Sequence, residues 1–139
     1  MNAVSVRFWI AVIAGCLLIS IPAVTQVSPS TTKASHVRIT EGPEMERVDP
    51  DFAIIRWTSN NPGGSPEHLA VVHYGTTPKE LSQTAQSPIR LNPSHPYTVF
   101  RVRMEDLKPR TKYFYKVDSM EANGKSDGVT SGVKQFTTR

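Results

Sequence analysis

From His36 to Thr137 the chain consists of short runs in which apolar and polar residues alternate, separated by Pro, Gly and Asn. A period of two residues places successive side chains on opposite faces of a strand, and no stretch repeats its apolar residues at helical spacing. Gly42-Pro43 is expected to end the first run, and Asn123-Gly124 is typical of a hairpin turn. The pattern predicts seven strands, over residues 36–40, 52–58, 69–74, 81–85, 97–104, 113–117 and 133–137.

Seven short strands without a helix predict an all-β fold. Strands with turns at such short intervals favour a seven-stranded antiparallel β-sandwich of two sheets, with an open barrel as the alternative. In the second run Ala53, Ile55 and Trp57 share one face, so Trp57 is expected in the core. At 139 residues the chain has room for one such domain.

The N-terminus has a different pattern, with Arg7 followed by an apolar run over residues 8–24. This layout is typical of a secretory signal peptide. Ala23 and Thr25 supply small residues at the −3 and −1 positions for cleavage before Gln26, and a retained membrane anchor is the alternative. We therefore divide the chain into a signal peptide (1–25), a polar flexible linker (26–35) and a folded domain (36–139), and expect a secreted or extracytoplasmic protein.

Cys16 is the sole cysteine, and Ile13-Ala14-Gly15-Cys16 resembles the lipobox of bacterial lipoproteins. The apolar residues Leu17 and Leu18 that follow depart from that motif, so Cys16 is expected to be an ordinary residue of the apolar run. Attachment to a membrane through a lipid on Cys16 is the alternative. Cleavage before Gln26 would leave a chain without cysteine, which excludes a disulfide scaffold, a cysteine zinc site and a thiol nucleophile.

One stretch matches a known sequence signature, namely LKPRTKYFYKV at residues 107–117. It resembles the L-x-P-x-T-x-Y signature of fibronectin type III domains, which implies an immunoglobulin-like β-sandwich. The resemblance implies that Leu107 fills the core, that Pro109 and Thr111 shape a turn, and that Tyr113 makes a tyrosine corner through its hydroxyl. Trp57 fits the tryptophan on the second strand of that family.

A narrower resemblance rests on Val72-His73-Tyr74-Gly75-Thr76-Thr77-Pro78, Leu81, Thr84-Ala85 and Gln135-Phe136-Thr137-Thr138. These residues are similar to the type III-like domain that precedes the catalytic domain of purple acid phosphatases. The similarity covers roughly residues 36–138. In that family the metal ligands lie in the following domain, in motifs such as G-D-x-x-Y, G-N-H-[DE] and G-H-x-H. These 139 residues contain no Gly-Asp, Gly-Asn-His or His-x-His, so we expect no enzymatic activity from this chain.

Other patterns of catalytic residues are equally absent from the sequence. The four histidines, His36, His68, His73 and His95, are isolated and fall on different predicted elements, so no metal or other cofactor is expected. Ser65 follows Gly63-Gly64 but lacks the G-x-S-x-G spacing and the strand-to-helix turn of a nucleophile elbow.

The basic residues do not point to nucleic acid. The net charge is +4, and from His36 onward 14 Lys and Arg residues stand against 12 Asp and Glu residues, a net +2. Type III topology would place the strands of a basic strip in different sheets, which favours a solvated surface over a binding site for an anionic partner. The strip consists of Arg101, Arg103, Lys108, Arg110, Lys112 and Lys116.

A second surface is apolar. If the strands at 69–74 and 113–117 are neighbours, the outward-facing side chains of Leu69, Val71 and Phe114 would lie near one another and form an interaction surface. The alternative is that the stems of Lys112 and Lys116 cover them. We expect a secreted or cell-surface module for protein interaction or spacing, with another protein or domain as its partner. A membrane partner is expected only through a retained N-terminal segment or a lipidated Cys16. The alternative is the accessory domain of a purple acid phosphatase-like enzyme whose catalytic domain is absent from this chain.

Overall fold

A computed structural model describes residues 32–139, and all regular structure in this range is β-strand. The expected signal peptide, Cys16 and residues 26–31 of the expected linker lie outside the described residues. Residues 32–139 contain no helix that is long and apolar enough to span a membrane. The strands are β1 (Ile39–Val48), β2 (Ala53–Asn60), β3 (Glu67–Gly75), β4 (Gln83–Arg90), β5 (Tyr97–Met104), β6 (Lys112–Glu121), β7 (Ser126–Thr130) and β8 (Lys134–Thr137).

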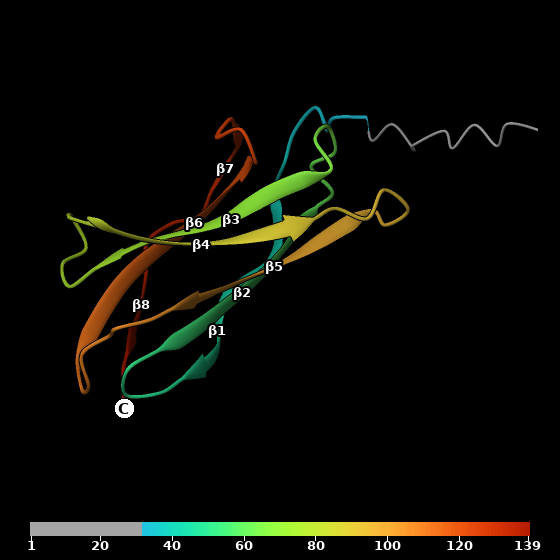
Figure 1. Cartoon of the computed structure of the whole chain (residues 1–139). Coiled ribbons are helices and arrows are strands. Elements are labelled where there is room, and N and C mark those ends of the chain that lie inside the picture. Colours follow the sequence, from blue (N-terminus) through green and yellow to red (C-terminus); the bar gives the residue numbers. More distant parts are fainter. Residues whose placement is uncertain (1–31) are drawn as a thin grey trace, which may run out of the picture.

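The strands form two antiparallel sheets that face each other (Figure 1). One sheet has the order β1-β2-β5, and the other has the order β4-β3-β6-β7 with β8 paired to the same strand β6. Because the chain builds two separate sheets, the fold is the expected β-sandwich and the open barrel is excluded.

The core lies between the sheets and follows the alternation of each strand. Ala53, Ile55 and Trp57 on β2 are at most 1% exposed, and the Trp57 ring stacks on Phe100 with 5.2 Å between ring centroids. The rest of this core cluster comes from both sheets and from the turn before β6, namely Ala70, Val72, Tyr74, Val102, Met104, Leu107, Tyr113, Tyr115, Val117 and Phe136.

The first strand differs from the prediction because it passes through Gly42-Pro43. The predicted strand covered residues 36–40, whereas β1 starts at Ile39 and runs to Val48. Gly42 has φ +80°, and the register of β1 with β2 shifts between Glu41 and Glu44. Gly42-Pro43 is therefore an irregularity within the strand. An edge strand tolerates such an irregularity, and a proline, because its outer side has no partner to lose.

Three further strands differ from the prediction, and all lie at edges of the larger sheet, with β4 at one edge and β7 and β8 at the other. The predicted strand at 81–85 is displaced to β4, whose residues alternate only between half-buried and exposed. The strand β7 was not predicted at all, and β8 begins one residue later than expected. Both β7 and β8 pair with β6, and Ser131 between them exchanges two hydrogen bonds with Val117, one through its N–H and one through its hydroxyl. They are therefore two parts of one interrupted edge strand.

Residues just before the domain also contact it. The Ala34 N–H donates to the Pro62 carbonyl at 2.8 Å, and the Lys33 ammonium pairs with Glu121 at 2.6 Å. This ion pair raises the pKa of Lys33 and lowers the pKa of Glu121, in each case chiefly through their mutual hydrogen bond. The end of the expected linker thus lies against the loop between β2 and β3.

Candidate functional site

The strongest candidate for a binding surface is the outer face of β3 and β6, the central strands of the larger sheet. Their register places Leu69 opposite Met120, Val71 opposite Asp118, His73 opposite Lys116 and Gly75 opposite Phe114. The inner face of this sheet packs on the other sheet, and none of the eight strands covers its outer face. We call the residues Leu69, Val71, His73, Lys116, Asp118 and Met120 the β3–β6 face.

The three residues expected to form one apolar surface are not contiguous. Leu69 is half-buried, whereas Val71 is completely buried beneath its neighbours. Phe114 is half-buried and lies beyond the His73–Lys116 pair, because it is four residues along β6 from the partner of Val71. The apolar neighbour of Leu69 is Met120, which the sequence analysis did not identify because its predicted strand ended at Val117.

The carboxylate of the β3–β6 face, Asp118, is already partly shielded from water. The side chain of Asp118 is 22% exposed, and one of its oxygens, Oδ1, is buried without a hydrogen-bond partner among the described residues. Burial raises the pKa of Asp118, while the nearby His73 ring, at 3.7 Å from Nε2 to Oδ2, opposes the shift. A partner that covers this face would therefore remove little further water from the carboxylate.

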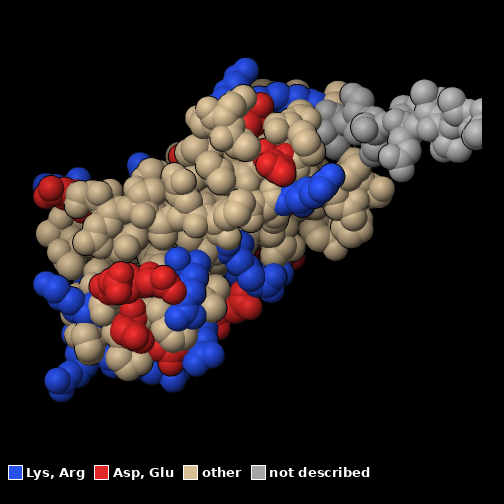
Figure 2. Space-filling view, in the orientation of Figure 1, with Lys and Arg blue, Asp and Glu red and all other residues tan. Residues whose placement is uncertain are grey.

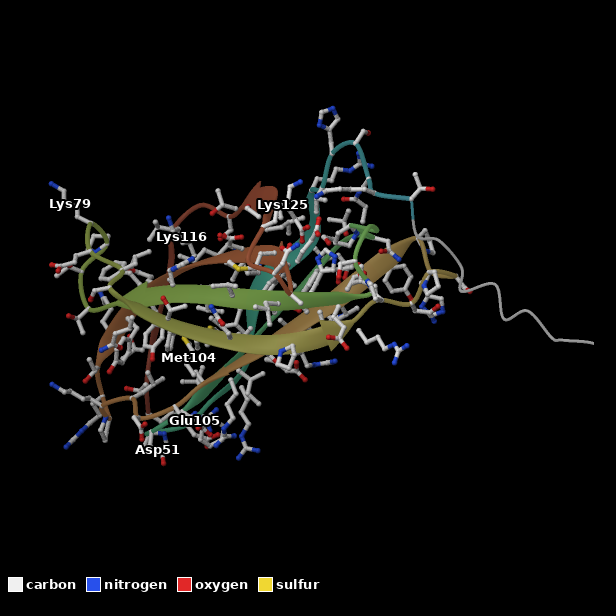
Figure 3. All side chains as sticks on the ribbon, turned by 45° about the horizontal axis from the view of Figure 1, so that its top comes forward. Asp51, Lys79, Met104, Glu105, Lys116 and Lys125 are labelled. Atoms are coloured by element: carbon white, nitrogen blue, oxygen red, sulfur yellow. The ribbon has the colours of Figure 1, made fainter. Side chains whose placement is uncertain are left out.

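Charged residues of the smaller sheet form a different kind of surface. Arg101 pairs with Glu46 at 2.6 Å and Arg103 with Glu105 at 2.8 Å, so these cations are neutralised locally. Figure 2 shows Lys or Arg and Asp or Glu side chains next to each other in the lower part of the molecule, where β1, β2 and β5 lie. In Figure 3, Lys116 lies on the side of the molecule away from Asp51 and Glu105. Arg101 and Arg103 thus lie on the smaller sheet and Lys112 and Lys116 on the larger one, with Lys108 and Arg110 in the turn between them.

The structure places the residues of the type III signature around one turn. Leu107 is 5% exposed, and the Tyr113 hydroxyl accepts a hydrogen bond from the Lys108 N–H at 2.9 Å. Thr111 donates its hydroxyl to the Pro109 carbonyl at 2.9 Å, which holds the turn before β6. Tyr74 packs edge-on against the Tyr113 ring with 6.2 Å between centroids. These residues stabilise the fold and leave no reactive group exposed.

A buried polar cluster at the other end of the sandwich was not predicted. His68 donates from Nδ1 to Asp127 at 2.9 Å and from Nε2 to the Gly63 carbonyl at 3.1 Å, and both side chains are fully buried. Since both ring nitrogens face oxygen atoms that can accept a hydrogen bond, these contacts favour the doubly protonated, positively charged imidazole. Burial alone would lower the pKa of His68, but Asp127, the Gly63 carbonyl and Glu121 outweigh it and raise that pKa.

This cluster contains the residue types of a Ser-His-Asp triad in an order that cannot activate a nucleophile. Ser119 donates its hydroxyl to Asp127 at 2.8 Å rather than to His68, whose remaining nitrogen is occupied by a carbonyl. Ser119 is also completely buried. A general base must reach the proton of its nucleophile, so the cluster has a structural role. The partners are 59 residues apart in sequence, and no local pattern joins them.

The other histidines do not come together either. His73 lies on the β3–β6 face, while His95 packs its ring against Tyr97. Within residues 32–139 no group of three or more His, Cys, Asp or Glu side chains is arranged to hold a metal ion.

The two sheets and the tyrosine corner define an immunoglobulin-like β-sandwich of the fibronectin type III kind. The family described as "Purple acid Phosphatase, N-terminal domain" matches residues 43–138, and the chain belongs to this family. No curated protein sequence matches the chain.

Solved structures with the same fold include the sensor domain of the anti-sigma factor RsgI4 from Pseudobacteroides cellulosolvens. Its short form is 22% identical with a TM-score of 0.52, and the match covers 76% of this chain and 97% of that chain. Its long form is 19% identical with a TM-score of 0.50, and the match covers 73% of this chain and 88% of that chain. At this identity the likeness shows the fold alone.

Proposed function

We propose that this protein is an extracytoplasmic, non-catalytic module that binds another protein or domain through the β3–β6 face. The observation that carries the proposal is the Leu69–Met120 pair, two half-buried apolar side chains directly opposite each other on a sheet face that no other strand covers. Sheets that face water usually place polar residues there, so an apolar pair favours a second surface packing on it.

The surroundings of this pair define the chemistry of the partner. Lys116 is half-buried on the same face, and it interacts electrostatically with Asp118 but forms no salt bridge among the described residues. A carboxylate on the partner would therefore complement it. Val71 and Asp118 lie between Lys116 and the Leu69–Met120 pair. Val71 is completely buried and the Asp118 side chain is 22% exposed, so a partner would remove little further water from them on binding. The partner is therefore a protein surface with an apolar centre and an acidic side chain at its rim.

Extracytoplasmic placement rests on the N-terminal segment. The apolar run over residues 8–24 after Arg7 is typical of an export signal, and the small residues Ala23 and Thr25 suit cleavage before Gln26. The N-terminal sequence of the protein recovered from its host tests this step directly. A start at Gln26 supports export with cleavage, and a start at Cys16 with an added lipid mass would place the module on a membrane instead.

Co-purification from the native host tests the interaction. The Leu69→Glu variant is expected to lose a partner that the wild-type chain retains, because a carboxylate would be buried beside Asp118. Val133→Glu is the matched control, since Val133 is 49% exposed and lies outside the β3–β6 face. Equal recovery of the partner by all three proteins would refute the assignment of this face.

The family membership favours a second candidate, the accessory domain of a purple acid phosphatase-like enzyme. In that case the partner of the β3–β6 face would be a catalytic domain in the same or another chain. The intact mass of the native protein separates the candidates. A mass below 15.4 kDa supports a free-standing module, whereas a mass several times larger supports the accessory domain.

A further inference from the structure

We propose a second binding site, a saccharide site in a hollow on the outer face of the smaller sheet. The hollow has a volume of about 380 Å³ and is lined by Thr40, Glu41, Arg56, Thr58, Tyr97 and Val99. It lies on the opposite sheet from the β3–β6 face, so it is independent of the function proposed above.

An exposed aromatic ring forms one wall of the hollow. Tyr97 is 51% exposed, and it and Val133 are the large apolar residues that stand out into solvent among residues 32–139. Tyrosine offers a flat apolar surface with a polar tip, and it loses little conformational entropy on binding because it has few rotatable bonds. The C–H face of a pyranose ring is the complementary surface, since it is flat and apolar while its edges carry hydroxyl groups.

The position of Tyr97 is fixed before any ligand arrives. Asn61 donates from Nδ2 to the carbonyls of Asn92 and His95, at 2.9 and 2.8 Å, and from its backbone N–H to the Pro96 carbonyl at 2.9 Å. These bonds tie the loop before Tyr97 to the end of β2. The His95 ring also packs against the Tyr97 ring, with 5.8 Å between centroids. Preorganisation of this kind reduces the entropy lost on binding.

The opposite wall carries hydrogen-bonding groups of both kinds. Thr58 donates its hydroxyl to Glu41 Oε2 at 3.2 Å, which orients the carboxylate and leaves Oε1 free of partners among the described residues. Arg56 uses Nη1 to donate to Glu44 at 3.3 Å and retains further N–H groups. An acceptor and a donor side by side match the hydroxyl groups of a sugar, each of which can both donate and accept.

The charged side chains in and beside the hollow, Glu41, Glu44 and Arg56, disfavour the binding of an anion. Arg56 is compensated by Glu44, and Glu41 adds a further negative charge, so no excess of positive charge remains to attract a phosphate or a sulfated glycan. A neutral saccharide is the ligand class that fits the aromatic wall, the paired donor and acceptor, and this charge together.

Titration of the full-length chain with neutral hexasaccharides tests the proposal. The probes are maltohexaose, cellohexaose, xylohexaose and chitohexaose. The readout is the NMR resonances of the Tyr97 ring in the wild type and of the Thr58 and Val99 backbone amides, which line the hollow, in every variant. At least one probe is expected to shift these resonances at millimolar concentration. Tyr97→Ala and Glu41→Gln should each weaken binding about tenfold, and Tyr97→Phe should retain most of it.

The control variant is Val133→Ala, which removes the other exposed apolar side chain and should leave binding unchanged. The proposal is overturned if no probe moves the resonances of residues that line the hollow, or if a folded Tyr97→Ala variant binds as tightly as the wild type. It is equally overturned if a heparin-derived hexasaccharide or inorganic phosphate binds in the hollow and the neutral probes do not.

Discussion

The hydroxyl of Tyr113 accepts a hydrogen bond from the backbone N–H of Lys108, with 2.9 Å between the two atoms. The bond closes the turn between β5 and β6, whose start is held by a second bond from the Leu107 N–H to the Asp51 carbonyl at 2.9 Å. The turn contains Asp106 and Arg110 with φ of 56° and 48°, a conformation that costs energy for residues other than glycine. The tyrosine hydroxyl therefore stabilises a strained turn.

Tyr113→Phe is predicted to lower the free energy of unfolding by about 1 to 2 kcal/mol, since it removes this bond and leaves the turn unsupported. Urea denaturation measures the change. Tyr115→Phe is the matched control on the same strand, because its hydroxyl has no hydrogen-bond partner within residues 32–139, and it should cost less than about 0.5 kcal/mol. An equal loss in both variants would contradict the role given to Tyr113.

Much of the fold could be predicted because the central strands carry clear alternation. The strand at 97–104 was predicted with its observed bounds, and Ala53, Ile55 and Trp57 lie in the core as expected. The edge strands could not be predicted in the same way. In β7, the sequence SDGVT buries too little apolar surface to produce a pattern, and its place depends on pairing with β6.

The candidate site was predicted only in part, for a geometric reason. The sequence indicates which residues face outward, but the register of β3 with β6 decides which of them are neighbours. That register pairs Leu69 with Met120 and places His73–Lys116 between Val71 and Phe114. The His68–Asp127 pair was missed for the same reason, since it depends on a contact between strands far apart in sequence.

The buried His68–Asp127 pair predicts a pH dependence of stability. The pKa of His68 is raised above its ordinary value of 6.5 in the folded state, so its contribution is complete below pH 6.5 and is lost as pH rises through the folded-state pKa. The Nε2 and Cε1 resonances of His68 should therefore report a protonated ring above pH 6.5. A ring that is neutral at pH 6 would contradict this prediction.

The same pair can be tested by substitution. Asp127→Asn is predicted to lower the free energy of unfolding by about 3 kcal/mol at pH 6, because it leaves a buried imidazolium without its counter-ion. The difference between this variant and the wild type should shrink as pH rises above 6.5. A difference that is constant across pH would show that the charge of His68 does not contribute.

Gly63→Ala is predicted to displace the segment that enters the domain. Gly63 has φ +63°, and a Cβ there would lie 2.1 Å from the Thr32 carbonyl oxygen. Gly128→Ala is the control, since its φ is +78° but its Cβ would meet nothing within 4 Å. Both variants bear the backbone cost of about 1 kcal/mol. Only Gly63→Ala should speed hydrogen exchange at the Ala34 amide, which donates to Pro62.

Substitutions at Trp57 test how much its unpaired indole N–H costs the folded core. Its Nε1 is buried without a hydrogen-bond partner among the described residues, and its ring stacks on Phe100. Trp57→Phe keeps an aromatic ring and removes the unpaired N–H, so it should cost less than about 2 kcal/mol. Trp57→Ala should cost about 3 to 5 kcal/mol because it leaves a cavity. Equal losses in a denaturation series would refute this account.

The measurement that tests the proposed function most directly is site-specific photo-crosslinking in the native host. A photoreactive amino acid is placed at Leu69 in one variant and at Val133 in another, and the adducts are identified by mass spectrometry. The account predicts one dominant protein adduct from position 69 that is absent from position 133 and is suppressed when Lys116→Glu is added. No adduct at position 69, or the same adducts from both positions, would contradict the claim that the β3–β6 face binds a partner.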